Sequence, residues 1–283
     1  MNKMGQGYEG SSDYIASRPL MEIVNVAIIL GKPLVIKGEP GTGKTLLAHS
    51  IAKALKKELV IWNIKSTTKA KDGLYVYDTV QRLNDARFKD RDISDIRQYI
   101  KLGKLGQSFT SELQVVLLID EIDKADIEFP NDLLNELDEM SYHISELDEE
   151  VKAKQRPIVI ITSNSEKELP DAFLRRCVFY YIEFPDEEMM ERIVKVHYPD
   201  IHDKLMRDAI KKFYWIRQVA GLRKKPSTSE LLDWIKALAA GGLDLEKIAS
   251  EVPFLGTLIK SEQDTERVAR TVQSHGPFGI RRR

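Results

Sequence analysis

The feature that most constrains this chain is the segment 38–45, GEPGTGKT, which lies between an apolar run and an amphipathic run. It matches the pattern G-x-x-x-x-G-K-[ST] of a phosphate-binding loop, and its flanks predict the strand and the helix that such a loop requires. Glycines let the backbone curl so that successive N–H groups point at phosphate oxygens, and the helix start adds partial positive charge. The sequence therefore predicts a nucleotide site rather than an ordinary glycine-rich turn.

The loop residues have separate expected roles. Lys44 is expected to reach the β and γ phosphates, and the Thr45 hydroxyl is expected to bind Mg²⁺, which bridges those phosphates. The residues expected to surround the phosphates are Gly38, Glu39, Pro40, Gly41, Thr42 and Gly43. The expected ligands are thus ATP and Mg²⁺.

Short apolar runs recur along the chain and predict strands at residues 33–37, 59–64, 115–120, 157–162 and 179–184. Most of them are apolar throughout, as expected when helices cover both faces of a parallel sheet. Between the first two runs, Leu47, Ile51, Leu55 and Leu59 repeat at four-residue spacing, which indicates a helix. The pattern predicts a βαβ unit within an α/β domain.

The rest of the chain predicts a second, smaller domain. Residues 65–110 are charged and too long for an ordinary connection, so they indicate an insertion or a moving part. After residue 185 the pattern is helical. We therefore predict a nucleotide-binding domain over 1–185, a helical domain over 186–270 and a loose tail over 271–283.

Two carboxylates follow the apolar run 115–120. A strand that ends in a carboxylate places it in the crevice where open α/β sheets bind ligands, beside the loop of a neighbouring strand. Asp120 is expected to hold Mg²⁺ through water, and Glu121 to orient and deprotonate the attacking water. The plainer interpretation is that both acids stabilise a helix N-terminus. No [NT]-K-x-D tetrad is present, which argues against a GTPase.

Three more polar residues are candidates. Asn164 follows the run 157–162, where its amide is placed to contact the γ-phosphate or the attacking water; an Asx turn is the alternative. Arg175 and Arg176 precede the last predicted strand, and an arginine there can neutralise charge in the transition state or form a surface ion pair.

Composition limits the partners. The net charge is −1, so the chain lacks the basic field that holds proteins on phosphate backbones. The single cysteine, Cys177, excludes an internal disulfide. No apolar run approaches the roughly 20 residues that span a bilayer. We expect a cytoplasmic protein without membrane insertion, and nucleic acid is not its expected partner.

Together these residues resemble the AAA+ ATPases, and more narrowly their MoxR-like branch, over residues 14–270. GEPGTGKT resembles the Walker A motif, VVLLIDE the Walker B motif, Asn164 the sensor 1 residue, and Arg176, with Arg175, the arginine finger that acts on the neighbouring subunit's nucleotide. The resemblance implies a parallel five-stranded sheet of order 5-1-4-3-2, a small α-helical lid and a ring that is commonly hexameric. Residues 65–110 and 141–156 resemble the insert and the hairpin of the branch.

The resemblance departs from the family at the lid arginine called sensor 2. The corresponding position is Ser229, in the stretch RKKPSTSELLDW. Arg223, Lys224 and Lys225 are the nearby candidates to replace it, and the role stays unassigned.

The resemblance also implies a chaperone-like assembly or activation factor that acts on a protein client, often a metalloenzyme, together with a von Willebrand factor A-type partner. A nucleic-acid motor or loader on the same core is the alternative, and the neutral charge argues against it. A P-loop kinase is a third possibility, but Glu121 and the arginine pair suit water as the acceptor.

The charges are unevenly distributed. Residues 120–150 hold thirteen Asp and Glu against one Lys, and residues 204–225 hold eight Lys and Arg against one acid. Each segment would repel itself unless it met opposite charge or lay in solvent. We expect the acidic segment to face basic lid surface of a neighbouring protomer or to receive a partner.

Overall fold

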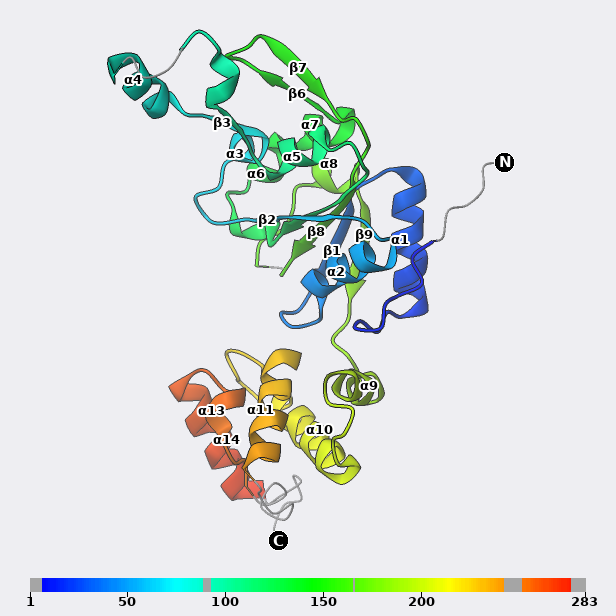
Figure 1. Ribbon diagram of the computed structural model, residues 1–283. Coiled ribbons are helices and arrows are strands. Elements are labelled where there is room, and N and C mark those ends of the chain that lie inside the picture. Colours follow the sequence, from blue (N-terminus) through cyan, green and yellow to red (C-terminus); the bar gives the residue numbers. More distant parts are fainter. Residues whose placement is uncertain (1–6, 89–92, 165, 242–250, 276–283) are drawn as a thin grey trace. The chain divides into compact units, whose positions relative to one another are not determined.

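The computed structural model describes residues 7–88, 93–164, 166–241 and 251–275. The chain forms two compact units, Met1–Glu39 with Gly43–Ile182, and Pro40–Thr42 with Glu183–Arg283. The first unit contains α1 (Arg18–Leu30), β1 (Leu34–Gly38), α2 (Lys44–Ala54), β2 (Leu59–Asn63), α3 (Ala70–Leu74), β3 (Tyr75–Tyr77), α4 (Thr79–Phe88), η1 (Ile96–Tyr99), β4 (Ile100–Leu102), α5 (Lys104–Thr110), β5 (Val116–Asp120), η2 (Ile122–Lys124), α6 (Phe129–Asp132), α7 (Leu134–Glu139), β6 (Ser141–Ile144), β7 (Glu149–Lys152), β8 (Ile158–Ser163), α8 (Asp171–Leu174) and β9 (Val178–Ile182) (Figure 1). The second contains α9 (Glu187–His197), α10 (Asp203–Arg217), α11 (Thr228–Ala240), α13 (Leu255–Leu258) and α14 (Glu262–His275). None of these described helices has the length and apolar character needed to cross a membrane.

The central sheet of the first unit is parallel, with five strands in the order β2-β5-β8-β1-β9. Counted among these strands alone and read from β9, the order is 5-1-4-3-2, as expected. The labels differ from that count because β3 with β4, and β6 with β7, form separate two-stranded sheets. Since the strands are parallel, their carboxyl ends all lie at one edge of the sheet, where ligands bind in this fold class.

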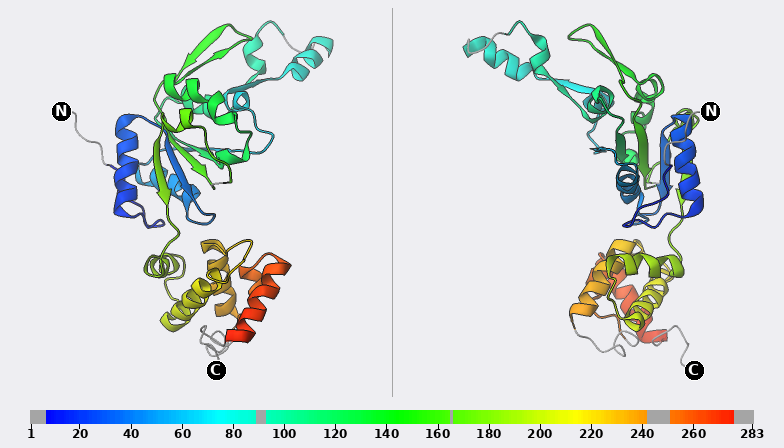
Figure 2. Two further views of the ribbon diagram at one scale, coloured as in Figure 1. Left: turned by 180° about the vertical axis from the view of Figure 1, so that it is seen from behind. Right: turned by 45° about the vertical axis from the view of Figure 1, so that its right-hand side comes forward.

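Both faces of the sheet are covered, which explains the continuous apolar runs. Every residue of β8 is buried, whereas the edge strands β2 and β9 alternate between more and less exposed positions. Side chains such as Leu34 and Val116 pack with α1 and α2 on one face, and Val35 and Leu117 pack with α5 to α8 on the other. The two helical layers can be followed on either side of the sheet in Figure 2.

Helix α2 is shorter than the four-residue spacing predicts. Leu47 and Ile51 are fully buried, as expected for its inner face. The helix ends at Ala54, Lys56 adopts a left-handed conformation with φ 52°, and Leu59 begins β2. The expectation that Leu59 continues the helical stripe is therefore wrong, because the chain has already turned into the next strand.

Residues 65–110 have a packed base and an exposed arm. At the base, a Cβ on Gly73 would lie 2.2 Å from Cη2 of Trp62, so α3 can approach β2 closely only with glycine there. Leu105 and Phe109 of α5 are fully buried. By contrast, α4 has no buried residue, and Figure 1 shows it projecting away from the sheet. The segment is therefore anchored at both ends and extends outward between them.

The strands β6 and β7 form the expected hairpin near 141–156, paired antiparallel with Tyr142 opposite Val151. Its acids are partly neutralised inside the protomer. Glu149 forms an ion pair with Arg97, and Glu146 lies 3.8 Å from Lys71. The acidic segment thus already meets opposite charge from the 65–110 insertion, which removes part of the reason to expect a basic surface from a neighbour.

The second unit has its own apolar core. Trp234 of α11 is fully buried, and its indole N–H donates to the Pro253 carbonyl at 2.6 Å. We predicted a loose tail from residue 271, but α14 continues to His275. The prediction is wrong for 271–275 because Val268 and Val272 extend an apolar stripe that packs on this core. Residues 276–283 lie outside the described part of the chain.

Candidate nucleotide site

The phosphate loop joins the carboxyl end of β1 to the first turn of α2, as predicted. Glu39, Pro40, Gly41 and Thr42 make the connection. Gly41 and Gly43 have φ of 78° and 84°, a left-handed region that favours glycine. A Cβ on Gly43 would also lie 3.1 Å from Cε2 of Tyr14. The sequence pattern therefore has a steric cause at Gly43, where both the backbone and the tyrosine ring exclude a larger residue.

Lys44 lies folded back over this loop. Its Nζ donates hydrogen bonds to the carbonyl oxygens of Gly38 and Glu39, both at 2.8 Å, and the residue is only 6% exposed. Burial lowers the pKa of Lys44, and the nearby charge of Asp123 is the largest effect opposing it. The ammonium is thus held at the mouth of the loop, where an incoming phosphate would offer it stronger acceptors.

Asp120 and Thr45 come together although 75 positions separate them in the chain. The Thr45 hydroxyl donates to Oδ1 of Asp120 at 3.0 Å, with Oδ2 at 3.3 Å. Thr162 of β8 also donates to Oδ1 of Asp120, at 2.6 Å. As the expected strand order implies, β8 lies between β1 and β5, and Thr162 of β8 lies between the phosphate loop strand and Asp120.

The hydroxyl and carboxylate oxygens of Thr45 and Asp120 are the hard donors that Mg²⁺ prefers. Among the described residues, no group of three or more His, Cys, Asp or Glu side chains is arranged to hold a metal ion. A magnesium ion bound through few protein oxygens and the phosphates of a nucleotide fits this donor set.

Glu121 is fixed by its backbone and by both carboxylate oxygens. Its φ of 59° and ψ of 52° are left-handed, which is uncommon outside glycine and costs about 1–3 kcal/mol. Its N–H donates to the Thr162 hydroxyl at 2.8 Å. Oε1 accepts a hydrogen bond from Nδ2 of Asn164 at 2.8 Å, and Oε2 forms an ion pair with Lys124. The hydrogen bond with Glu121 is the main cause that raises the pKa of Lys124.

Asn164 therefore contacts the candidate base directly, which the sequence alone did not indicate. Three further residues of this network were also missed: Thr162, Asp123 and Lys124. Thr162 is a polar residue near the end of an apolar run, and Asp123 follows another such run, so the sequence does contain a weak indication of both. It cannot show that they are neighbours, because this depends on the register of β5 and β8.

The arginine pair lies at the other end of the sheet. Both residues follow α8 and precede β9, whose first residue pairs with Leu34 at the start of β1. Gly38 is four residues further along β1, or about 13 Å at the rise of a strand. The fold thus places Arg175 and Arg176 away from the loop of their own chain.

The two arginines differ in their contacts. Arg176 forms an ion pair with Asp138 of α7 and donates to the Ala172 carbonyl at 3.2 Å. Arg175 is exposed, and within the part of the chain that the structure describes its guanidinium has no hydrogen-bond or ion-pair partner. Of the pair, Arg175 is therefore the more available to another molecule.

The residues around Ser229, where the resemblance would place the sensor 2 arginine, belong to the second unit. Ser229 lies in the first turn of α11 and is exposed, while Ser227 and Glu230 form a capping box. The backbone N–H groups of Arg223 and Lys224 donate to the Asp264 carboxylate at 3.1 and 3.2 Å. These contacts give the stretch a structural role within its unit.

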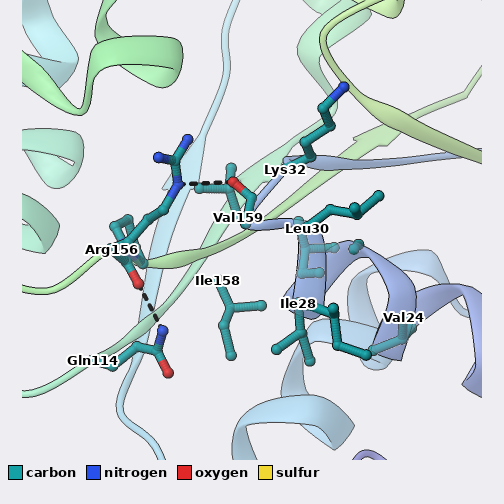
Figure 3. A pocket seen from close by; sticks show the side chains of 13 residues that line it. Val24, Ile28, Leu30, Lys32, Gln114, Arg156, Ile158 and Val159 are labelled. Atoms are coloured by element: carbon teal, nitrogen blue, oxygen red, sulfur yellow. Dashed lines mark hydrogen bonds between the residues drawn. The ribbon is translucent and has the colours of Figure 1, made fainter. Parts of the chain in front are cut away.

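A separate pocket of about 260 Å³ lies between α1 and the start of β8 (Figure 3). Arg156 closes one side by donating to the Gly31 carbonyl at 2.8 Å, and Gln114 donates to the Arg156 carbonyl at 2.8 Å. Its lining residues lie in α1 and the turn before β1, just before β5, or at the start of β8, so the pocket lies at the amino ends of these strands. It is therefore distinct from the candidate nucleotide site at their carboxyl ends.

Residues 34–185 match the model of the family described as ATPase family associated with various cellular activities (AAA). The chain belongs to the AAA family. The match covers the phosphate loop, all five strands of the central sheet and the arginine pair. The family supports an ATP-hydrolysing P-loop enzyme in general terms, built on the α/β fold observed here.

Three curated relatives align with parts of this AAA chain. They are midasin of Giardia intestinalis, 38% identical over 96 residues (33% of the chain and 2% of that protein), Lon protease of Campylobacter concisus (strain 13826), 32% over 117 residues (39% and 14%), and Lon protease homolog, mitochondrial 1 of Dictyostelium discoideum, 30% over 190 residues (62% and 18%). The chain spans less than a fifth of the length of each, so the likeness is to a segment of these proteins.

Proposed function

We propose that this AAA chain binds ATP with Mg²⁺ between its phosphate loop and the carboxyl ends of β5 and β8, and hydrolyses it with Glu121 as general base. The observation that carries the proposal is the hydrogen-bonded series from Thr45 through Asp120 and Thr162 to the backbone of Glu121. It joins a phosphate-loop side chain to a carboxylate pair from a different strand, as phosphoryl transfer to water requires.

In the proposed reaction, Glu121 accepts a proton from water as the water oxygen bonds to the γ-phosphorus. The bond between that phosphorus and the bridging oxygen of the β-phosphate breaks, giving ADP and phosphate. Lys44 neutralises charge on the transferred group, and Asn164 orients Glu121. Thr45 and Asp120 are the residues that would hold Mg²⁺, which when bound offsets the phosphate charges.

We further propose that the chain forms a ring of six subunits, in which an arginine of the pair 175–176 completes the nucleotide site of a neighbouring subunit. The position of the pair at the opposite end of the sheet favours action in trans, because a head-to-tail interface brings different surfaces of identical chains together. The unpaired guanidinium favours Arg175, with Arg176 as the alternative.

The biological role that we propose is that of a MoxR-like assembly or activation factor for a protein client, working with a von Willebrand factor A-type partner in the cytoplasm. It is supported by the insertion at 65–110 and the hairpin β6–β7, both of which resemble that branch. The exposed helix α4 offers a surface that a client can bind without displacing the residues of the sheet.

The test is phosphate release from ATP by the purified chain, compared with Glu121→Gln and Lys44→Ala. We expect Mg²⁺-dependent hydrolysis that Glu121→Gln abolishes while ATP remains bound, and weak binding in Lys44→Ala. Stimulation by DNA or RNA would favour the nucleic-acid motor instead, and label transfer from ATP to an added acceptor would favour a kinase. Copurification with the Glu121→Gln form as bait then identifies the client.

A further inference from the structure

We propose that Asp123 is a positioning residue that holds Asn164 in contact with Glu121. Asp123 lies in η2, two residues after Glu121, and none of the roles assigned above uses its side chain. The inference rests on the proposed function, since it concerns how the base Glu121 is oriented for attack on ATP.

The contacts of Asp123 all lead to the segment that carries Asn164. Oδ2 of Asp123 accepts hydrogen bonds from the backbone N–H groups of Asn164 and Glu166, both at 3.0 Å. Lys167 strengthens the same junction by donating to the Ala125 carbonyl at 2.7 Å. The segment after β8 is thus attached at three points to η2 and the residue that follows it, and one carboxylate oxygen supplies two of them.

Burial makes this arrangement significant. Asp123 is only 3% exposed, and its Oδ1 has no hydrogen-bond partner among the described residues. An anionic carboxylate removed from water is costly unless its hydrogen bonds are strong, as bonds from N–H groups to a charged acceptor are. A loop that was free to move would not need a buried carboxylate bound to two of its N–H groups. The burial of Asp123 therefore indicates that the backbone at residues 164 and 166 must be held in a fixed position.

The geometry that Asp123 fixes is the one that Glu121 requires. With its backbone N–H bound to Asp123, Asn164 is held where its Nδ2 reaches Oε1 of Glu121 at 2.8 Å. A displacement of about 1 Å in a catalytic group can cost about 10²-fold in rate. Asp123 therefore acts through Asn164 on the orientation of the base and makes no contact with substrate in this scheme.

The experiment compares Asp123→Ala, Asp123→Asn and Asp126→Ala in the full chain. Asparagine keeps a side-chain oxygen that can accept both N–H bonds but removes the charge, whereas alanine removes the acceptor. Asp126→Ala is the matched control, because Asp126 is an exposed acid in the same segment. For each variant we measure kcat, the Kd of ATP and the amide hydrogen exchange of the peptide containing residues 164 and 166 in the absence of nucleotide.

In Asp123→Ala we expect kcat to fall by about 10- to 100-fold, Kd to stay near that of the parent chain, and exchange at 164–166 to accelerate. Asp123→Asn should restore much of kcat and of the protection, and Asp126→Ala should change neither. Unchanged exchange, or an equal loss of kcat in the asparagine and alanine variants, would overturn the positioning role, as would a loss of ATP binding that matches the loss of rate. If the parent chain hydrolyses no ATP, the proposed function fails, and the exchange measurement alone still tests the contact.

Discussion

The two ends of the central sheet differ in how far their polar groups are paired within the chain. At the carboxyl ends of β5 and β8, Asp120 and Glu121 are joined to Thr45, Thr162 and Asn164 by hydrogen bonds. Before the amino end of β9, the guanidinium of Arg175 has no hydrogen-bond or ion-pair partner in the described part of the chain. The polar groups at the first end are thus paired within the protomer, whereas at the second end one of the two arginine side chains is left unpaired.

The difference agrees with the proposal that a neighbouring subunit supplies the arginine. Groups that must be oriented before reaction, such as a general base and metal ligands, gain from being fixed inside one chain. An arginine that neutralises charge only in the transition state can be supplied by a second chain, and hydrolysis then depends on assembly. The predictions below test the two ends separately, from the largest expected effect to the smallest.

The largest effect on kcat is expected for Arg175, whose guanidinium is unpaired. Arg175→Ala should lower kcat by about 10³-fold or more, because transition-state charge would no longer be neutralised. ATP affinity should change little, since the pocket of the same chain is intact. Steady-state phosphate release and equilibrium nucleotide binding on the assembled protein measure the two quantities.

Mixing two inactive variants tests whether Arg175 acts on the nucleotide of a neighbouring subunit. Arg175→Ala chains and Lys44→Ala chains, each nearly inactive alone, should recover part of the activity when combined, because some interfaces then join an intact pocket to an intact arginine. Mixed rings without any recovery would contradict action in trans. Full activity of a monomeric parent chain would do the same.

At the first end, Glu121→Gln should lower kcat by about 10²- to 10⁴-fold, the range expected for loss of a general base. Glutamine keeps the size of the side chain and can still accept the Asn164 hydrogen bond, so ATP should remain bound. Trapped nucleotide is measured by separating the protein from free ATP. Hydrolysis near the parent rate would remove Glu121 from the base role.

Thr162→Val tests the bridge between β5 and β8. Valine keeps the shape but leaves the part-buried N–H of Glu121 without its acceptor. The loss for a fully buried group is about 1–3 kcal/mol of stability, so we expect the lower part of this range. We expect a drop in the unfolding midpoint together with reduced kcat, because the left-handed backbone of Glu121 loses its support. Thr265→Val, which removes a hydroxyl in the second unit, should leave kcat unchanged; equal losses in both variants would contradict the bridge.

The smallest effect is expected for the ion pair of Arg176. Both side chains are over 40% exposed, and such pairs contribute about 0–1 kcal/mol. A double-mutant cycle of Arg176→Ala and Asp138→Ala, followed by urea unfolding, should give a coupling in this range. If Arg176→Ala instead reduces hydrolysis as strongly as Arg175→Ala, Arg176 shares the trans role and the comparison of the two arginines is wrong.

Much of the fold was predictable because its signals are local. The apolar runs predicted all five strands of the sheet to within two residues at each end, since a strand buried on both faces must be apolar throughout. The segment 65–110 was predicted only as an insertion or a moving part. Its packing depends on Gly73 lying against Trp62, a contact that composition does not reveal. The end of α14 was missed because only the packing of Val268 and Val272 on the core of the second unit shows that the helix continues.

The sequence by itself determined the phosphate loop, because G-x-x-x-x-G-K-T between a strand and a helix specifies a backbone conformation within eight consecutive residues. It also placed Asp120 and Glu121 at a strand end. Only the tertiary structure decided that Thr162 links them, that Asp123 holds Asn164, and that Arg176 is paired whereas Arg175 is not. The reason is physical: these partners lie about 40 positions apart, and only the order and register of the strands set which side chains meet.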